Sequence, residues 1–145
     1  MFHHNKSRRC FTLELCKGLA HVAIAVENLE NSIKWYEKIG GKCHNRGELK
    51  TDIGVKKLAL VNLFGVDFEL IENEVPEKLP SGAITHVAIT VVDLPKVIEY
   101  LKEKGVDSFM TEEIVNMPEL FGGLRNIFIK GPDGEEIEFI EMGNF

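Results

Sequence analysis

Two stretches of this sequence, HVAIAVENLENSIKWYEKIGG at residues 21–41 and HVAITVVDLPKVIEYLKEKGV at residues 86–106, are closely similar and decide the fold. Their starting positions lie 65 residues apart, and their apolar, polar and glycine positions recur in register. A second repeat links GVDFELIE at residues 65–72 with GEEIEFIE at residues 134–141. Such internal similarity is typical of a duplicated supersecondary unit. The sequence therefore predicts two related modules.

Each repeat begins as a strand and continues as a helix. From residue 21 to 26, Val and Ile alternate with His and Ala, which is the period-two pattern of a strand, and residues 86–91 repeat it. The helices are expected from the N-cap residue Asn28 to Gly40 and from Asp93 to Gly105. Their apolar residues recur at spacings of three and four, so each helix has one apolar face that covers the Val and Ile face of the strands.

The rest of each module is rich in strand-forming residues. Strands are predicted at residues 42–48, 55–62 and 66–72 in the first module, and at 107–111, 124–130 and 136–142 in the second. The fold class is therefore α+β, with two βαβββ modules. The expected organisation is an N-terminal arm (1–17) and a single domain (18–142) that contains module 1 (about 18–73), a Pro-containing linker (74–81) and module 2 (about 82–142).

Composition excludes several classes of protein. The 145 residues, 44% of them hydrophobic, fit one globular domain, and no apolar run reaches the length of a membrane-spanning helix. A net charge of −6 argues against a nucleic-acid partner. Cys10, Cys16 and Cys43 show no metal-binding or disulfide spacing, and the opening residues lack the apolar core of a secretory signal. We therefore expect reduced thiols and a cytoplasmic location.

Four residues share the sheet face that the helices leave free. His21 and His86 stand there beside small residues, and strand alternation places Glu69 and Glu138 on the same face. A single strand histidine or glutamate is usually structural or solvated, but here both types recur at matching positions of the two repeats. Two imidazoles and two carboxylates suit a divalent ion such as Zn, Ni, Co, Mn or Fe(II). The sequence therefore predicts one divalent-metal site.

The paired HVAIxV segments, the GPDGEEIEF hairpin at residues 131–139 and the four candidate ligands resemble the vicinal-oxygen-chelate superfamily, which includes glyoxalase I. The resemblance covers residues 18–142 and implies that the two modules curl their mixed sheets into a cup, with the helices outside and one divalent metal within. It matches His21, Glu69, His86 and Glu138 to the metal-ligand positions. It also implies a homodimer, with a cup built within one chain or shared by two.

Within this superfamily, a carboxylate at position 69 favours a lyase or isomerase of the glyoxalase I (lactoylglutathione lyase) type. By resemblance, such an enzyme shifts a proton on a small 2-oxo or 2-hydroxycarbonyl compound, or its thiol adduct, through a metal-chelated enediolate. Glu138 is then the expected base and Glu69 its partner. Two alternatives stay open: an enzyme similar to methylmalonyl-CoA epimerase, and a metal-free ligand-binding or resistance module.

The sequence offers three candidate substrate-binding residues, on weaker grounds than the metal ligands. Arg46 and Arg125 are candidates for pairing with a substrate carboxylate or phosphate, although each is also an ordinary strand residue. Phe121 lies in a long segment, residues 111–123, that is a candidate lid. Gly131 stands where similar glyoxalase I sequences commonly have Asp. His44 receives no role from the sequence.

Overall fold

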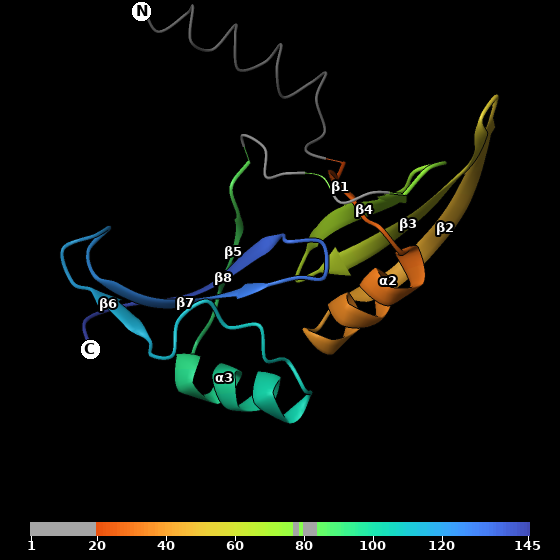
Figure 1. Cartoon of the computed structure of the whole chain (residues 1–145). Helices are drawn as coiled ribbons and strands as arrows, with labels where there is room; N and C mark the ends of the chain where they lie inside the picture. The colour runs from red at the N-terminus through yellow and green to blue at the C-terminus, as the bar shows by residue number, and fades with distance from the viewer. Residues whose placement is uncertain (1–19, 77–78, 80–83) are drawn as a thin grey trace, which may run out of the picture.

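The computed structural model describes residues 20–76, 79 and 84–145, and it confirms the α+β class and the two βαβββ modules (Figure 1). Module 1 contains β1 (Val22–Ala25), α2 (Leu29–Lys38), β2 (Lys42–Thr51), β3 (Gly54–Leu63) and β4 (Val66–Glu72). Module 2 contains β5 (Val87–Thr90), α3 (Leu94–Glu103), β6 (Val115–Met117), β7 (Leu124–Lys130) and β8 (Glu136–Met142). The expected arm, residues 1–17, lies outside the described residues.

Each module forms one four-stranded mixed sheet with the same topology. The strand order is β1-β4-β3-β2 in the first sheet and β5-β8-β7-β6 in the second. The first strand of each module runs parallel to the last, with Val22 opposite Phe68 and Val87 opposite Ile137, and all other pairs are antiparallel. The duplication in sequence is therefore a duplication in register. Described residues contain no helix long and apolar enough to cross a membrane.

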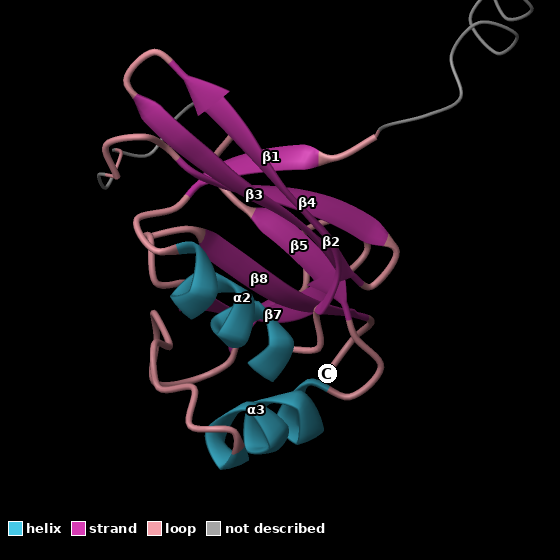
Figure 2. Cartoon of the chain, turned by 90° about the vertical axis from the view of Figure 1, so that its right-hand side faces the viewer, coloured by secondary structure: helices cyan, strands magenta, loops and turns pink. Residues whose placement is uncertain are grey.

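The helices begin and pack as their sequences predict. The side chain of Asn28 accepts a hydrogen bond from the backbone N–H of Asn31 at 3.0 Å, and Asp93 does the same for Lys96 at 3.2 Å. Figure 2 shows α2 and α3 on one side of the sheets. The helix stripes and the facing strand residues form one buried core that spans both modules, and it includes Leu29, Ile33, Tyr36, Leu70, Leu94, Leu101, Ile137 and Phe139.

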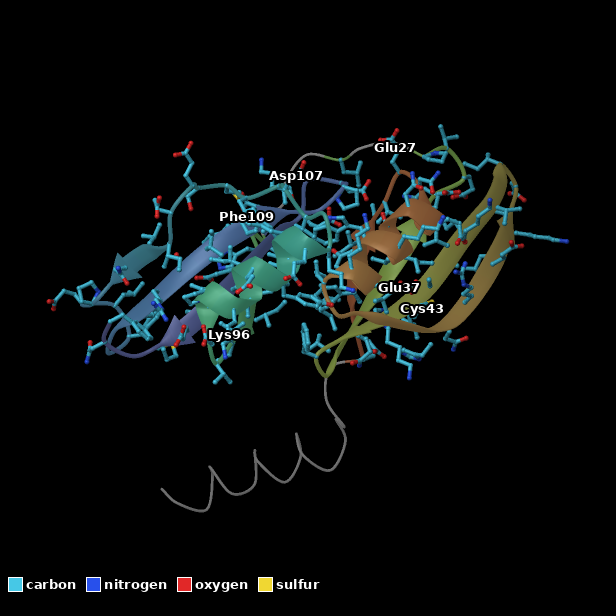
Figure 3. The ribbon with its side chains drawn as sticks, turned by 90° about the horizontal axis from the view of Figure 1, so that it is seen from below. Glu27, Glu37, Cys43, Lys96, Asp107 and Phe109 are labelled. Atoms are coloured by element: carbon cyan, nitrogen blue, oxygen red, sulfur yellow. The ribbon has the colours of Figure 1, made fainter. Side chains whose placement is uncertain are left out.

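The strand predicted at residues 107–111 is wrong. Phe109 makes only an isolated bridge to Ile129, and the regular strand at this sheet edge is β6, further along the chain. Figure 3 shows Asp107 and Phe109 on the segment that runs beside α3. The hydroxyl of Thr111 bonds the carbonyl of Glu113 at 2.9 Å, and this local turn interrupts the edge. Part of the candidate lid, residues 115–117, is thus a strand of the sheet.

The hairpin between β7 and β8 joins the two modules. At its turn, Asp133 accepts hydrogen bonds from the Glu27 backbone N–H at 2.7 Å and from the Ser32 hydroxyl at 2.9 Å. The Tyr36 hydroxyl lies 3.0 Å from Oε2 of Glu135. Burial and the neighbouring Glu135 charge raise the pKa of Tyr36, while burial raises the pKa of Glu135. The hydroxyl therefore donates to the carboxylate, and this polar contact fixes module 2 against α2.

Candidate metal centre

The structure brings the four predicted ligands together as two pairs. Nε2 of His21, just before β1, lies 3.5 Å from Oε1 of Glu69 on β4. In module 2, Nε2 of His86 lies 3.3 Å from Oε1 of Glu138 on β8. Each pair follows from the parallel pairing of the first and last strands, which places the histidine one strand away from the glutamate on the same face.

The two pairs do not meet within one chain. In the described residues, no three His, Cys, Asp or Glu side chains are grouped so that they could hold a metal ion. Glu69 lines a cavity of about 270 Å³ on the first sheet, whereas His86 lines a separate cavity of about 460 Å³ that also touches Ala23 and Ala25 of β1. One chain therefore presents two separate His–Glu pairs.

The two His–Glu pairs differ in how firmly neighbouring side chains hold the carboxylate. The Asn126 side chain donates a 2.7 Å hydrogen bond to Oε2 of Glu138, and both residues are buried. The ring of Phe128 packs edge-on against His86, with centroids 5.3 Å apart. In module 1, Leu60 lies opposite Glu69, and the Glu69 side chain is 23% exposed against 10% for Glu138. The carboxylate of Glu138 is therefore fixed by a hydrogen bond and by burial, whereas the more exposed carboxylate of Glu69 is freer to move.

The donor set of each pair fits a divalent ion. Two ligand atoms bound to one ion at about 2.0–2.2 Å lie roughly 3 Å apart when they are adjacent in its coordination shell. The observed nitrogen-to-oxygen separations of 3.5 and 3.3 Å are close to this value. His and Glu from both halves would hold the ion, and their two carboxylates would offset its charge. Within one chain, however, only two of the four donors share each site.

A second polar cluster occupies the same face of module 1. Nε2 of His44, on β2, lies 3.0 Å from Oδ1 of Asp67, on β4, and the Asn62 side chain donates to the same oxygen at 2.9 Å. These hydrogen bonds, with Asn62 first and His44 second, hold the pKa of Asp67 below its ordinary value. Asp67 therefore stays ionised and accepts a hydrogen bond from the imidazole.

Of the three predicted substrate contacts, Arg46 lines the cavity that contains Glu69. Arg46 pairs with Glu30 of α2, its Nη2 at 3.2 Å from Oε2, on the helix side of the sheet. Arg125 pairs with Glu141 at 2.9 Å and stacks on the Phe145 ring, 3.9 Å from its centroid. Phe121 is 78% exposed and has a positive φ of 49°. Their roles toward substrate stay predictions.

Two glutamates that the sequence analysis left without a role support the helices. Oε1 of Glu72 accepts the Leu29 N–H at 2.9 Å, and Oε1 of Glu141 accepts the Leu94 N–H at 2.7 Å. Each carboxylate thereby satisfies a free donor and faces the positive end of a helix dipole. The sequence contained a signal for this shared role, because both repeats, GVDFELIE and GEEIEFIE, end in a glutamate.

Comparison with known proteins gives the family. The family model of the Glyoxalase/Bleomycin resistance protein/Dioxygenase superfamily matches residues 18–139. The chain belongs to this superfamily.

Its relatives include two proteins of Bacillus subtilis (strain 168). YwbC, an uncharacterized protein, is 33% identical over 132 residues, which are 88% of this chain and 99% of YwbC. A probable trivalent organoarsenical cleaving enzyme is 28% identical over 119 residues, which are 82% of this chain and 76% of that enzyme. The superfamily is thus shown by sequence, and the reaction is not.

Solved structures confirm the fold. The glyoxalase family protein from Enterococcus faecalis aligns with a TM-score of 0.71 at 23% identity, covering 88% of this chain and 99% of that protein. The fosfomycin resistance protein FosX from Listeria monocytogenes, in complex with Mn(II) and sulfate, aligns with a TM-score of 0.63 at 18% identity, covering 88% and 93%.

Proposed function

We propose that this protein is a metal-dependent lyase or isomerase of the glyoxalase I type. Its substrate would be a small 2-oxo or 2-hydroxycarbonyl compound, or the thiol adduct of one. The observation that carries the proposal is the pair of His–Glu contacts at matching positions of the two modules. The cofactor would be one divalent ion, Ni, Zn, Co, Mn or Fe, held by His21, Glu69, His86 and Glu138. When bound, such an ion polarises a substrate carbonyl and acidifies the neighbouring C–H bond.

The complete site, we propose, forms between two copies of the chain. In each copy, Glu69 and His86 line separate cavities, and each His–Glu pair supplies two donors. Joining one pair from each protomer yields four donors with two imidazoles and two carboxylates. This arrangement makes the homodimer the active form and gives two equivalent sites per dimer, as two-fold symmetry requires.

The contacts of Glu69 and Glu138 also favour different roles for the two carboxylates in proton transfer. The resemblance ranks Glu138 first as the base, but Asn126 holds Oε2 of Glu138 in a buried hydrogen bond. Glu69 is more exposed and faces the cavity lined by Leu58 and Leu60. A base must reach the substrate carbon and then move to deliver the proton. We therefore assign proton transfer to Oε1 or Oε2 of Glu69 and a fixed supporting role to Glu138.

The proposal is tested by metal content and proton transfer measured on the same preparations. We would use the full chain in a background where His3 and His4 are changed to Ala, so that terminal histidines bind no metal. About one divalent ion per chain is expected, and His86→Ala should abolish its binding. The metal-loaded protein should isomerise the hemithioacetal of a 2-oxoaldehyde. Glu69→Gln should lower its kcat by about 100-fold or more, and Lys50→Gln, an exposed change on β2, should not.

The remaining outcomes separate the alternatives. Exchange of the α-proton of an acyl-CoA, with no turnover of hemithioacetals, would favour an epimerase and contradict the glyoxalase I type. Absence of bound metal after titration with each of the five ions would leave a metal-free ligand-binding module. In that case, Glu69→Gln and Glu138→Gln would not alter any response of the melting temperature to added metal.

A further inference from the structure

His44 lies on the face of the first sheet that carries the His21–Glu69 pair. The pairing of β2 with β3 shifts between Cys43 and Asn45, so His44 is an extra residue in its strand. Cys43 packs toward the core, while the His44 side chain reaches Asp67. Bulges of this kind commonly re-aim a side chain next to a functional site.

His44 is the end of a hydrogen-bonded row that crosses three strands. Asn62 on β3 and His44 on β2 both bond Oδ1 of Asp67 on β4. A carboxylate only accepts hydrogen bonds, so Nε2 of His44 carries the proton in this contact. The other ring nitrogen, Nδ1, has no hydrogen-bond partner among the described residues. An aspartate thus fixes the ring and its tautomer, and leaves one nitrogen available.

This row lies directly beside the His21–Glu69 pair. Asp67 precedes Glu69 by two residues on the same strand face. The backbone of His44 lies two strands from β4, about 10 Å away, and its ring reaches across β3 to within 3.0 Å of Asp67. The His44 side chain is 42% exposed and can therefore meet a ligand.

We propose that His44, oriented by Asp67, is a ligand-binding residue of this cup. Its Nδ1 would accept a hydrogen bond from a hydroxyl group of a ligand whose other oxygens lie at the His21–Glu69 pair. The chemical class that fits is a small hydroxy acid or hydroxycarbonyl compound, whose hydroxyl group meets Nδ1 and whose carbonyl or carboxylate oxygens lie at the pair. The inference rests on the cup of the proposed function, and it adds a residue that selects among substrates.

The test uses nitrogen-15 NMR of the histidine rings of the full chain, with glycolate as the probe, in the absence and in the presence of one equivalent of Zn²⁺. Before glycolate is added, His44 should show the tautomer protonated at Nε2, and Asp67→Asn should weaken this preference. Glycolate should shift the Nδ1 resonance of His44. Its dissociation constant should rise about five-fold or more in His44→Gln and stay unchanged in Lys50→Gln, while the Zn²⁺ content of His44→Gln equals that of the wild type.

The outcomes distinguish this inference from the proposed function. If Zn²⁺ does not bind, yet glycolate still shifts Nδ1 of His44 and His44→Gln weakens it, the metal-dependent function fails and the inference holds. If glycolate leaves Nδ1 unmoved, or binds His44→Gln as tightly as the wild type, the inference is wrong whether or not Zn²⁺ binds. Both proteins should give superimposable far-ultraviolet circular dichroism, because His44 is largely solvent-exposed.

Discussion

Glu141 provides a sharp test of how the second module is held together. Its Oε1 accepts the Leu94 N–H at the start of α3 at 2.7 Å, and the Arg125 Nε and Nη2 groups at 3.1 and 2.9 Å. The side chains of Glu141 and Arg125 are 12% and 21% exposed. Changing Glu141 to Gln keeps the shape and one acceptor but removes the charge, so the guanidinium loses its ionic partner.

The duplicated module supplies a matched control. Glu72 occupies the same place in module 1 and accepts the Leu29 N–H, but its cationic neighbour Lys57 is 54% exposed and 3.8 Å away. Hydrogen bonds to a charged group contribute about 1.5–3 kcal/mol, whereas an exposed ion pair contributes about 0–1 kcal/mol. We therefore expect Glu141→Gln to lower the free energy of unfolding by about 2–3 kcal/mol and Glu72→Gln by about 1 kcal/mol.

Urea denaturation followed by circular dichroism measures both values. All variants are compared at one protein concentration, because a dimer's apparent stability depends on concentration. The two substitutions change the net charge equally, so a general charge effect would alter both alike. An equal loss for the two variants, or a larger loss for Glu72→Gln, would refute the assignment of Glu141 as a shared support of α3 and Arg125.

Three further predictions concern the site and the junction between modules. Asn126→Leu should weaken metal binding by about 10–100-fold, because Glu138 loses the donor that orients it. Competition with a chelator measures the affinity, and an unchanged value would contradict the orienting role of Asn126. Burial raises the pKa of Glu135, so the folded state keeps the proton to higher pH than the unfolded chain, and stability should fall as the pH rises between the unfolded and the folded pKa. Glu135→Gln should remove this decrease in stability, as measured by urea titrations at a series of pH values. If the decrease persists in the variant, another group causes it. A side chain at position 131 would meet the carboxyl group of Glu135, which bonds Tyr36. Gly131→Ala should therefore lower the free energy of unfolding by about 1–3 kcal/mol and alter the tyrosine fluorescence. Unchanged stability and fluorescence would contradict this prediction.

Local sequence patterns predicted most of the fold because each element has its own periodicity and caps. Asn28 and Asp93 begin their helices as expected, and the predicted strands at residues 66–72, 124–130 and 136–142 match β4, β7 and β8 to the residue. The strand at residues 107–111 was wrong because its apolar content signalled burial, while the turn that interrupts the sheet edge depends on contacts of Thr111 and Glu113.

The site was harder to predict because its geometry depends on register and on placement of the modules. Alternation placed His21 with Glu69 and His86 with Glu138, and the structure brings each of these pairs into contact. Sequence could not show that Glu69 and His86 line separate cavities. Nor could it assign His44, because its partner Asp67 lies 23 residues further along the chain.

The central claim, a metal site shared by two protomers, is tested most directly by complementation between two defective chains. His21→Ala and His86→Ala would be prepared separately, each with a different affinity tag, and the mixed dimer would be isolated after co-expression. If each site joins the His21–Glu69 pair of one protomer to the His86–Glu138 pair of the other, one of the two sites in the mixed dimer keeps all four ligands. The mixed dimer should then bind about one ion, and neither parent dimer should bind any. A mixed dimer without metal, beside a wild-type protein that binds it, would contradict the shared site.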